Sequence, residues 1–301
     1  MRFDAIVVGG SFAGLAAATY IARGRRSVCV IDAGRPRNRF SAASHGVLGQ
    51  DGSNPLAMLA AARAQLGRYP GVTFVDGEAV DASAGHDVAV TLATGATLSG
   101  ARLVLAYGIS DVLPDLPGLA ERWGRSVLHC PYCHGYEFAD RRLGVLATSP
   151  LSAHQALLIA EWGPTTLYLD GGDGPDETTL ARLAARGVQV EPAKLAALVG
   201  DGTALSGLRF EDGRTAALDA LYLAPRSRLN SPIAERIGCA LDDGPFGPVV
   251  RTDATQMTTV SGVYAAGDLA RARHSVTWAT ADGVTAGVSA HQSLVFPSLA
   301  A

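Results

Sequence analysis

The stretch AIVVGGSFAGLAAATY, residues 5–20, decides the fold of this chain. Its apolar start predicts a buried strand over residues 4–8, and its glycines predict a tight turn from Gly9 to Gly14. The alanine-rich continuation predicts a helix up to Arg23, and residues 27–32 predict a second strand. Together these segments form a βαβ unit, so the sequence predicts an α/β fold with a parallel sheet.

The turn in this unit has the form of a dinucleotide-binding turn. Gly9 and Gly14 take the first and third glycine positions, and Ser11 takes the second, where a small residue lets backbone approach a pyrophosphate. The following helix directs its N-terminus at the phosphates. Asp32 stands 23 positions after Gly9, where an acid accepts hydrogen bonds from ribose hydroxyls. An ordinary strand–turn–helix connection is the alternative.

A second motif supports the dinucleotide site. Ala-Ala-Gly-Asp, residues 265–268, follows an apolar segment at residues 260–264. In flavoproteins with two dinucleotide domains, an Asp in this place holds the ribityl chain of the flavin. The paired motifs therefore predict non-covalently bound FAD, with Asp32 and Asp268 among its contacts.

The run CPYCH at residues 130–134 places two thiols one turn apart, within disulfide range. A structural zinc needs four ligands, and the remaining cysteines, Cys29 and Cys239, are isolated, so we expect no metal site. The run also matches a c-type haem attachment pattern and a glutaredoxin active site. Haem attachment requires export, and a glutaredoxin carries its motif after its first strand. Of these four interpretations, a redox dithiol that exchanges electrons with the flavin is the best supported.

The rest of the chain predicts two Rossmann-like domains, the second inserted into the first. The spacing of apolar residues predicts strands at 72–75, 87–92, 102–106, 143–147 and 165–169. It predicts helices at 151–162 and 275–294. Breaks occur at residues 113–118 and 223–225. We expect a discontinuous FAD-binding domain of residues 1–117 and 226–301. An inserted NAD(P)-binding-like domain of residues 118–225 would carry the cysteine pair.

Composition and charge restrict the function classes. Of 301 residues, 48% are hydrophobic and 18% charged, which is ample for sizeable cores. A net charge of −3 provides no excess of positive charge to attract nucleic acid or an anionic membrane. The sequence shows no bilayer-spanning run and no leader pattern. We expect a soluble cytoplasmic protein whose partners include neither nucleic acids nor membranes.

Together these residues resemble the low-molecular-weight thioredoxin reductase family over essentially the whole chain. The resemblance is greatest to its branch of small-molecule dithiol oxidases, which close the disulfides of gliotoxin, holomycin and romidepsin. The segment CPYCHGYE at 130–137 resembles that branch, with His134 where thioredoxin reductases usually have Asp. The segments DAGRPRNR at 32–39 and SHG at 44–46 are also similar to it.

The resemblance implies FAD, a homodimer and separate roles for the two cysteines. Cys133 would exchange electrons with the flavin ring, and Cys130 would form the mixed disulfide with substrate. His134 would carry the proton that the exchange requires. The helix N-terminus near Ser275 would favour the reduced, anionic flavin. The implied cofactor-binding residues are Gly9, Ser11, Phe12, Ala13, Gly14, Asp32, Ala33, Arg39, His45, Val80, Gly267, Asp268, Ser275 and Val276.

The inserted domain departs from the thioredoxin reductase pattern where NADPH would bind. The expected second glycine turn is replaced by ATSPLS, residues 147–152, which contains no glycine. After the next strand, acidic residues cluster over 170–177 and would repel a 2′-phosphate, although Arg182 and Arg186 follow. NAD(P)H is therefore disfavoured, though not excluded.

The leading hypothesis is an FAD-dependent dithiol–disulfide oxidoreductase that oxidises a dithiol and passes the electrons to oxygen or another acceptor. The substrate would be a small molecule or a small redox protein, and the sequence does not distinguish them. The first alternative is a thioredoxin reductase-type disulfide reductase driven by NAD(P)H. The second is a flavin-binding redox sensor.

Overall fold

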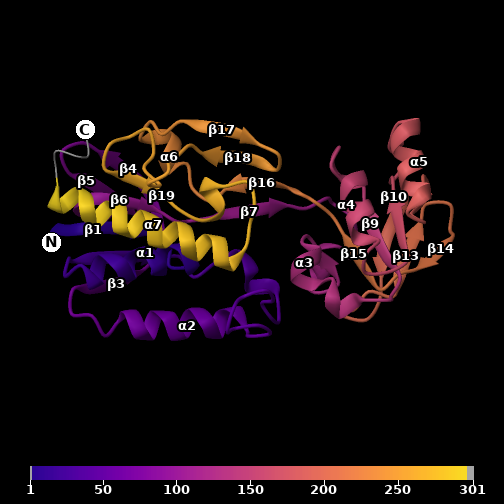
Figure 1. Ribbon diagram of the computed structural model, residues 1–301, viewed down its shortest axis with the longest axis horizontal. Helices are drawn as coiled ribbons and strands as arrows, with labels where there is room; N and C mark the ends of the chain where they lie inside the picture. Colours follow the sequence, from indigo (N-terminus) through magenta and orange to yellow (C-terminus); the bar gives the residue numbers. More distant parts are fainter. Residues whose placement is uncertain (1, 297–301) are drawn as a thin grey trace. The chain divides into compact units, whose positions relative to one another are not determined.

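The computed structural model describes residues 2–296, which pack as two compact units. The first unit contains residues 2–39, 56–110 and 227–296, and the inserted unit contains residues 40–55 and 111–226. Each is an α/β unit with a parallel sheet (Figure 1), so the fold class expected from the sequence is confirmed. The domain boundaries expected at 117/118 and 225/226 stay predictions.

The first unit is built on a seven-stranded sheet in the order β3-β2-β1-β6-β5-β4, with β19 paired to the end of β6. Strands β3, β2, β1, β6 and β19 are parallel, whereas β5 pairs antiparallel with both β6 and β4. The strands are β1 (Arg2–Val8), β2 (Val28–Asp32), β3 (Val72–Asp76), β4 (Ala79–Ala84), β5 (Val88–Leu92), β6 (Thr97–Leu105) and β19 (Val263–Ala265).

Strand β1 lies in the middle of this sheet and is buried on both faces. Ile6 and Val8 pack into the core on one face, and Ala5 and Val7 pack on the other. This burial explains why residues 5–8 form a continuous apolar run instead of an alternating one. The helices of the unit are α1 (Phe12–Arg23), α2 (Pro55–Leu66), α6 (Ile233–Arg236) and α7 (Val276–Val295).

Helix α7 packs directly against α1, as Figure 1 shows. Two glycines on α7 allow this approach. A Cβ at Gly283 would lie 2.1 Å from the carbonyl oxygen of Ala13, and one at Gly287 would lie 2.4 Å from that of Ala17. The C-terminal part of the chain is thereby placed beside the first turn of α1.

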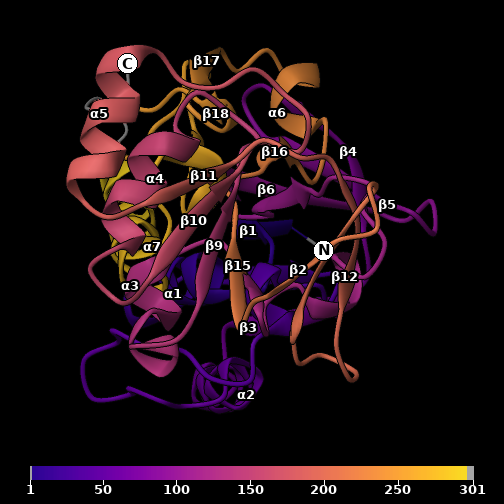
Figure 2. The same cartoon turned by 90° about the vertical axis from the view of Figure 1, so that its right-hand side faces the viewer.

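The inserted unit has a five-stranded sheet in the order β11-β10-β9-β15-β8, and Figure 2 shows β11, β10, β9 and β15 side by side. All its pairings are parallel. Helix α4 packs on β9 and β10, and α5 packs on α4. These elements are β8 (Val127–Leu128), β9 (Leu143–Leu146), β10 (Thr165–Tyr168), β11 (Gln189–Glu191), β15 (Ala220–Tyr222), α3 (Pro131–His134), α4 (Ser152–Ile159) and α5 (Glu177–Ala185).

Three smaller sheets complete the strands of the described residues. They are the antiparallel β12-β13-β14 of the inserted unit and the pairs β7-β16 and β17-β18. Their strands are β12 (Leu195–Val199), β13 (Gly207–Phe210), β14 (Thr215–Ala217), β7 (Ile109–Val112), β16 (Arg226–Leu229), β17 (Leu241–Gly244) and β18 (Gly247–Val250).

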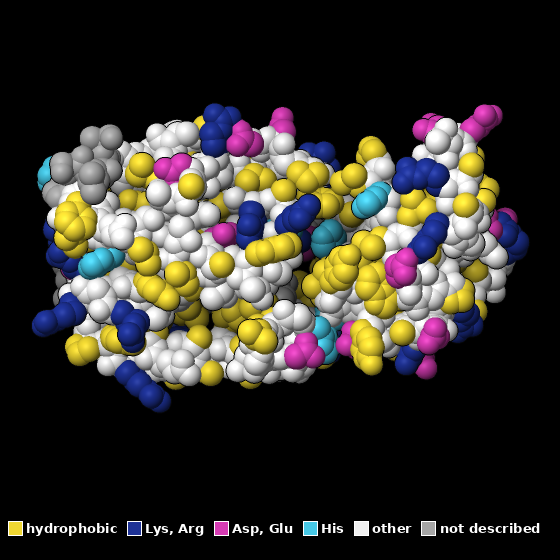
Figure 3. All heavy atoms as spheres, in the orientation of Figure 1, with side chains coloured by type: hydrophobic (Ala, Val, Ile, Leu, Met, Phe, Trp, Pro, Cys, Tyr) yellow, Lys and Arg dark blue, Asp and Glu magenta, His cyan; other side chains and the backbone are white. Residues whose placement is uncertain are grey.

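The surface carries charges of both signs. On the face shown in Figure 3, basic and acidic side chains are interspersed with hydrophobic ones rather than gathered into one field. Within residues 2–296, no helix has the length and apolar character needed to cross a membrane.

Candidate active site

The cysteine pair lies at the start of α3 in the inserted unit (Figure 1). Cys130 is the N-cap residue, with extended backbone (φ −103°, ψ 116°), and Pro131 takes the first helical position, where its fixed φ suits a helix. One turn brings the Sγ atom of Cys133 to 2.6 Å from that of Cys130. Both side chains are half-buried. The structure therefore brings the two predicted thiols into contact.

Neighbouring elements anchor α3 at both ends. The Nε2 atom of Gln155 on α4 donates to the carbonyl oxygen of His129, 2.9 Å away. The Tyr222 hydroxyl of β15 donates to the carbonyl oxygen of His134 at 3.4 Å. A Cβ at Gly135 would lie 2.5 Å from the carbonyl oxygen of Pro131. These contacts fix the thiols relative to the sheet of the inserted unit.

His134 ends α3 and is surrounded by polar groups from residues 40–55. Its Nε2 atom lies 3.5 Å from the Ser41 hydroxyl. The His45 ring stands edge-on to it, with ring centroids 6.0 Å apart. Burial lowers the pKa of His134 below its ordinary value; the negative charge of Glu137 opposes this effect and the charge of His45 adds to it. His134 is therefore neutral at neutral pH and able to accept a proton.

The glycine turn of the first unit, from Gly9 to Gly14, forms a cradle in which the glycines leave the backbone uncovered by side chains. Gly9 has a φ of +115°, and a Cβ there would lie 2.2 Å from the carbonyl oxygen of Ala106. A Cβ at Gly14 would lie 1.8 Å from the carbonyl oxygen of Gly9. Helix α1 begins after Ser11 with no side-chain cap and no acid in its first turn, so its first amides remain available to an anion. The cradle fits a dinucleotide pyrophosphate.

The two predicted acids also lie in the first unit. Asp32 ends β2, and its Oδ1 atom accepts from the amide of Gly34 at 3.0 Å. Asp268 begins a short 3-10 helix after β19, directly following Gly267, whose φ is +83°. The Asp268 Oδ2 atom pairs with Arg37 Nη1 at 2.9 Å. Arg37, which the sequence did not single out, therefore joins two segments that the sequence separates by more than two hundred residues.

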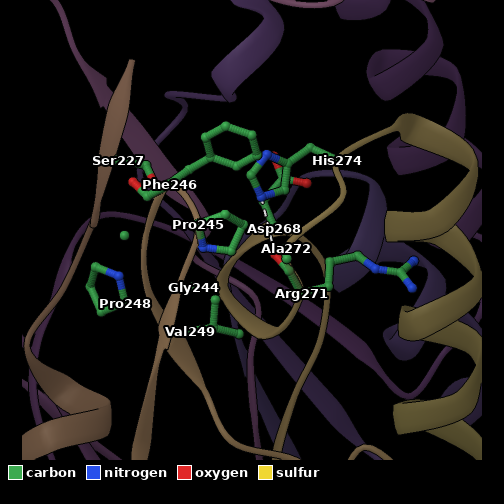
Figure 4. Close-up of a pocket in the computed structure, with 11 residues that line it drawn as sticks. Ser227, Gly244, Pro245, Phe246, Pro248, Val249, Asp268, Arg271, Ala272 and His274 are labelled. Atoms are coloured by element: carbon green, nitrogen blue, oxygen red, sulfur yellow. Dashed lines mark hydrogen bonds between the residues drawn. The ribbon is translucent and has the colours of Figure 1, made fainter. Parts of the chain in front are cut away.

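Asp268 also lines a small pocket between β17–β18 and the segment before α7 (Figure 4). The cavity that these residues enclose has a volume of about 10 Å³, which is about the space of one water molecule. Arg271 extends away from it toward α7, where its guanidinium carbon lies 5.2 Å from the centroid of the Trp278 ring. The fit of a cofactor therefore depends on the glycine cradle more than on this pocket.

The other residues expected to contact a cofactor are distributed over both units. Ser275 caps α7, where its hydroxyl accepts from the amide of Trp278 at 3.0 Å, and Val276 begins that helix. His45 lies in the inserted unit, beside His134. The rest belong to the first unit: Phe12 and Ala13 in the first turn of α1, Ala33 after β2, Arg39 in a 3-10 helix, and Val80 on β4. Cofactor contact by each stays a prediction.

The turn after β9 is filled by the chain itself. The Ser152 hydroxyl accepts from the amides of Thr148 and Ser149 at 3.0 and 3.2 Å, and Ser152 is 2% exposed. The Ser149 hydroxyl accepts from the amide of Leu151 at 3.3 Å. Amides in such a turn are the groups that hold phosphates in nucleotide-binding domains. Here protein oxygens already occupy them.

The segment after β10 is acidic, and Arg186 beyond it is engaged in an ion pair. Asp176 caps α5 by accepting from the amide of Thr179 at 2.7 Å. Asp170 Oδ1 accepts from the amide of Leu195 at 2.8 Å. Arg186 forms an ion pair with Glu161. Arg186 is thus directed to the residues that follow α4.

Comparison with known proteins identifies the chain. The family model for pyridine nucleotide-disulphide oxidoreductases matches residues 3–283. The chain belongs to this family. Thioredoxin reductase tcpT of Claviceps purpurea is 34% identical over 97% of this chain and 94% of its own length. Thioredoxin reductase sirT of Leptosphaeria maculans is 32% identical, covering 95% of this chain and 92% of the relative.

Solved structures agree. An oxidoreductase from Agrobacterium tumefaciens superposes with a TM-score of 0.94 at 43% identity, covering 99% of this chain and all of that one. HlmI superposes with a TM-score of 0.93 at 35% identity, covering 99% of this chain and 94% of that one. The protein is therefore a thioredoxin reductase-like disulphide oxidoreductase.

Proteins of this family bind FAD, and the residues of the first unit fit it. The cradle at Gly9 and Gly14 would hold its pyrophosphate, Asp32 its ribose and Asp268 its ribityl chain. Sequence reasoning missed Arg37, Glu137 and Ser152 as site residues. Glu137 could have been found from its spacing of three residues after His134. The role of Ser152 depends on a turn geometry that no sequence pattern specifies.

Proposed function

We propose that this disulphide oxidoreductase oxidises a dithiol substrate to a disulfide through Cys130 and Cys133, with FAD as the two-electron acceptor. The observation that carries the proposal is the 2.6 Å contact between the two sulfur atoms at the start of α3. Two thiols in contact across one helical turn are positioned to form a reversible disulfide.

The exchange proceeds in two steps. A substrate thiolate attacks Sγ of Cys130, breaking the bond between Cys130 and Cys133 and forming a mixed disulfide, while Cys133 leaves as a thiolate. The second thiol of the same substrate then attacks the substrate sulfur of the mixed disulfide. This attack closes the substrate disulfide and releases Cys130 as a thiolate. The substrate loses two electrons and two protons, and the cysteine pair gains the electrons. Bound FAD would supply the two-electron acceptor for the reduced cysteine pair, with oxygen or another compound as the final acceptor.

His134 is the proton carrier of this proposal. It directly follows Cys133 and is half-buried, and its lowered pKa keeps it neutral. A neutral imidazole takes the proton of an attacking thiol and returns it to the leaving sulfur. Ser41, at 3.5 Å from its Nε2 atom, supports the ring.

The direction of electron flow is supported by the turn after β9. Binding of NAD(P)H there would require its pyrophosphate to displace the Ser152 hydroxyl from two amides. The acids at 170–177 would repel the 2′-phosphate of NADPH. The relatives tcpT and sirT are named thioredoxin reductases, which favours the second candidate, an NAD(P)H-dependent thioredoxin reductase.

Anaerobic stopped-flow measurement of flavin bleaching separates these candidates. We expect rapid bleaching by dithiothreitol, slow bleaching by NADPH and NADH, and reoxidation by oxygen. The Cys130→Ser/Cys133→Ser double variant should lose bleaching by dithiol, whereas the matched Cys239→Ser variant should keep it. Fast bleaching by micromolar NADPH would favour the reductase. A single reduction without continued oxygen uptake would favour the sensor.

We also propose that the protein acts in the cytoplasm as a homodimer, with the domain boundaries at 117/118 and 225/226. Cys29 and Cys239 support a reducing compartment, because both are buried and unpaired. The homodimer is implied by the resemblance to thioredoxin reductases. Sedimentation of the FAD-loaded protein tests it, and a monomer at micromolar concentration would contradict it.

A further inference from the structure

Three potential metal ligands meet beside the dithiol. His45, His134 and Glu137 each direct one ligand atom into the same space, and these atoms all lie within 4.8 Å of one another. We propose that they form a binding site for a divalent transition-metal ion of the Zn²⁺ type. We further infer that the bound ion inhibits the enzyme by holding His134, an effect that rests on the proposed function.

The geometry is close to that of a tetrahedral site. Bonds of about 2.0–2.1 Å to nitrogen or oxygen place neighbouring ligand atoms roughly 3.3 Å apart. The Nε2 atom of His45 already lies 3.4 Å from Oε1 of Glu137. Glu137 is exposed, so rotation of its side chain can bring its carboxylate closer to His134 without repacking of a core. Two imidazoles and one carboxylate leave the fourth position to water, as in catalytic zinc sites.

A carboxylate from a fourth residue lies near the first histidine. Asp51 Oδ2 lies 3.6 Å from Nδ1 of His45, on the opposite side of the ring from Glu137. Asp51 is itself held, because its Oδ1 atom accepts from the amide of Gly46 at 2.8 Å. A carboxylate behind a ligating histidine fixes the tautomer and raises ligand basicity. The site thus has both a ligand set and a supporting carboxylate.

The contact between His86 and Asp87, at the surface of the first unit, has neither a third ligand nor a buried histidine. His86 lies 3.6 Å from Asp87, but its side chain is 97% exposed, and Asp87 is engaged by Arg2. By contrast, the side chain of His45 is 22% exposed. A half-buried histidine pair is held in place before the ion arrives, which lowers the entropy cost of chelation. His86 therefore serves as a matched control.

A metal ion bound at this site would block the proton transfer that the dithiol exchange requires. An ion bound to the imidazole of His134 occupies the lone pair that accepts the thiol proton in the proposed exchange. No bond to sulfur is required, so the ion would inhibit while both cysteines stay unliganded. Removal of the ion by a chelator should restore activity fully.

Titration of the FAD-loaded protein with Co²⁺ and Zn²⁺ tests the site. The variant Cys130→Ser/Cys133→Ser is used, so that thiols cannot bind the ion. We expect stoichiometric binding by calorimetry and a cobalt absorption band typical of four-coordination. His45→Ala and the isosteric Glu137→Gln should weaken binding at least about tenfold, and Asp51→Asn by about tenfold. His86→Ala should leave it unchanged.

Several outcomes would overturn the inference. Loss of binding in the cysteine double variant would assign the ion to the thiols. Unchanged affinity in both His45→Ala and Glu137→Gln would remove the ligand set, and Glu137→Gln decides if His45→Ala fails to fold. Zn²⁺ that binds here without slowing dithiol oxidation by the wild-type chain would refute the inhibition alone. The proposed function is judged separately, by turnover in chelator-treated enzyme.

Discussion

Replacement of Gly14 by alanine tests whether the glycine turn holds FAD. A Cβ at residue 14 would lie 1.8 Å from the carbonyl oxygen of Gly9 and 3.1 Å from Cγ1 of Val7. Both neighbours belong to β1 or the turn after it, so α1 must move away from the sheet. Overpacking of this kind costs about 1–3 kcal/mol of folding free energy.

The same movement displaces the first-turn amides of α1 from the pyrophosphate. A hydrogen bond to a charged group contributes about 1.5–3 kcal/mol. Loss of one such bond weakens FAD binding by about 10- to 150-fold. The dissociation constant is measured by reconstituting apoprotein with FAD and following flavin fluorescence, and the folding free energy by urea unfolding of the apoprotein.

Gly287→Ala is the matched control. Its Cβ would lie 2.4 Å from the carbonyl oxygen of Ala17, in the same helix pair but one turn farther from the phosphate cradle. We expect a similar loss of stability with FAD affinity changed less than about threefold. Equal FAD affinities in the Gly14 and Gly287 variants would refute the assignment of the turn to the cofactor.

Three further predictions follow from named contacts. Cys130→Ser should leave Cys133 able to form a thiolate–flavin charge-transfer band, whereas Cys133→Ser should trap substrate without reducing the flavin; full turnover in both would contradict the dithiol mechanism. Ser152→Ala leaves two partly buried turn amides without their acceptor, and urea unfolding should show a loss of about 1 kcal/mol. Burial would raise the pKa of Asp4, but hydrogen bonds from Ser27 outweigh it and lower that pKa. Its stabilising contribution is therefore present above the unfolded pKa of about 3.9 and lost as pH falls through the folded pKa. Melting curves should show that Asp4→Asn destabilises at pH 7 and has little effect near pH 2; equal effects at both pH values would contradict this.

Local patterns predicted the elements that carry the cofactor site. The strand and helix on either side of the glycine turn were expected at 4–8 and 15–23 and are found at Arg2–Val8 and Phe12–Arg23. The C-terminal helix, expected at 275–294, is found at Val276–Val295. Helix α2 was not predicted, because its alanine-rich sequence has no clear apolar face. Strand β4 was missed because its outer residues are polar and exposed.

The sequence by itself determined the cofactor turn and the dithiol, because both depend on residues within a few positions of one another. Backbone freedom at Gly9 and the one-turn spacing of Cys130 and Cys133 are local properties. The tertiary structure alone decided what surrounds them. Packing of residues 40–55 into the inserted unit places the His45 ring and the Ser41 hydroxyl beside His134. Such contacts depend on how distant segments fill the same space, which side-chain periodicity along the chain does not encode.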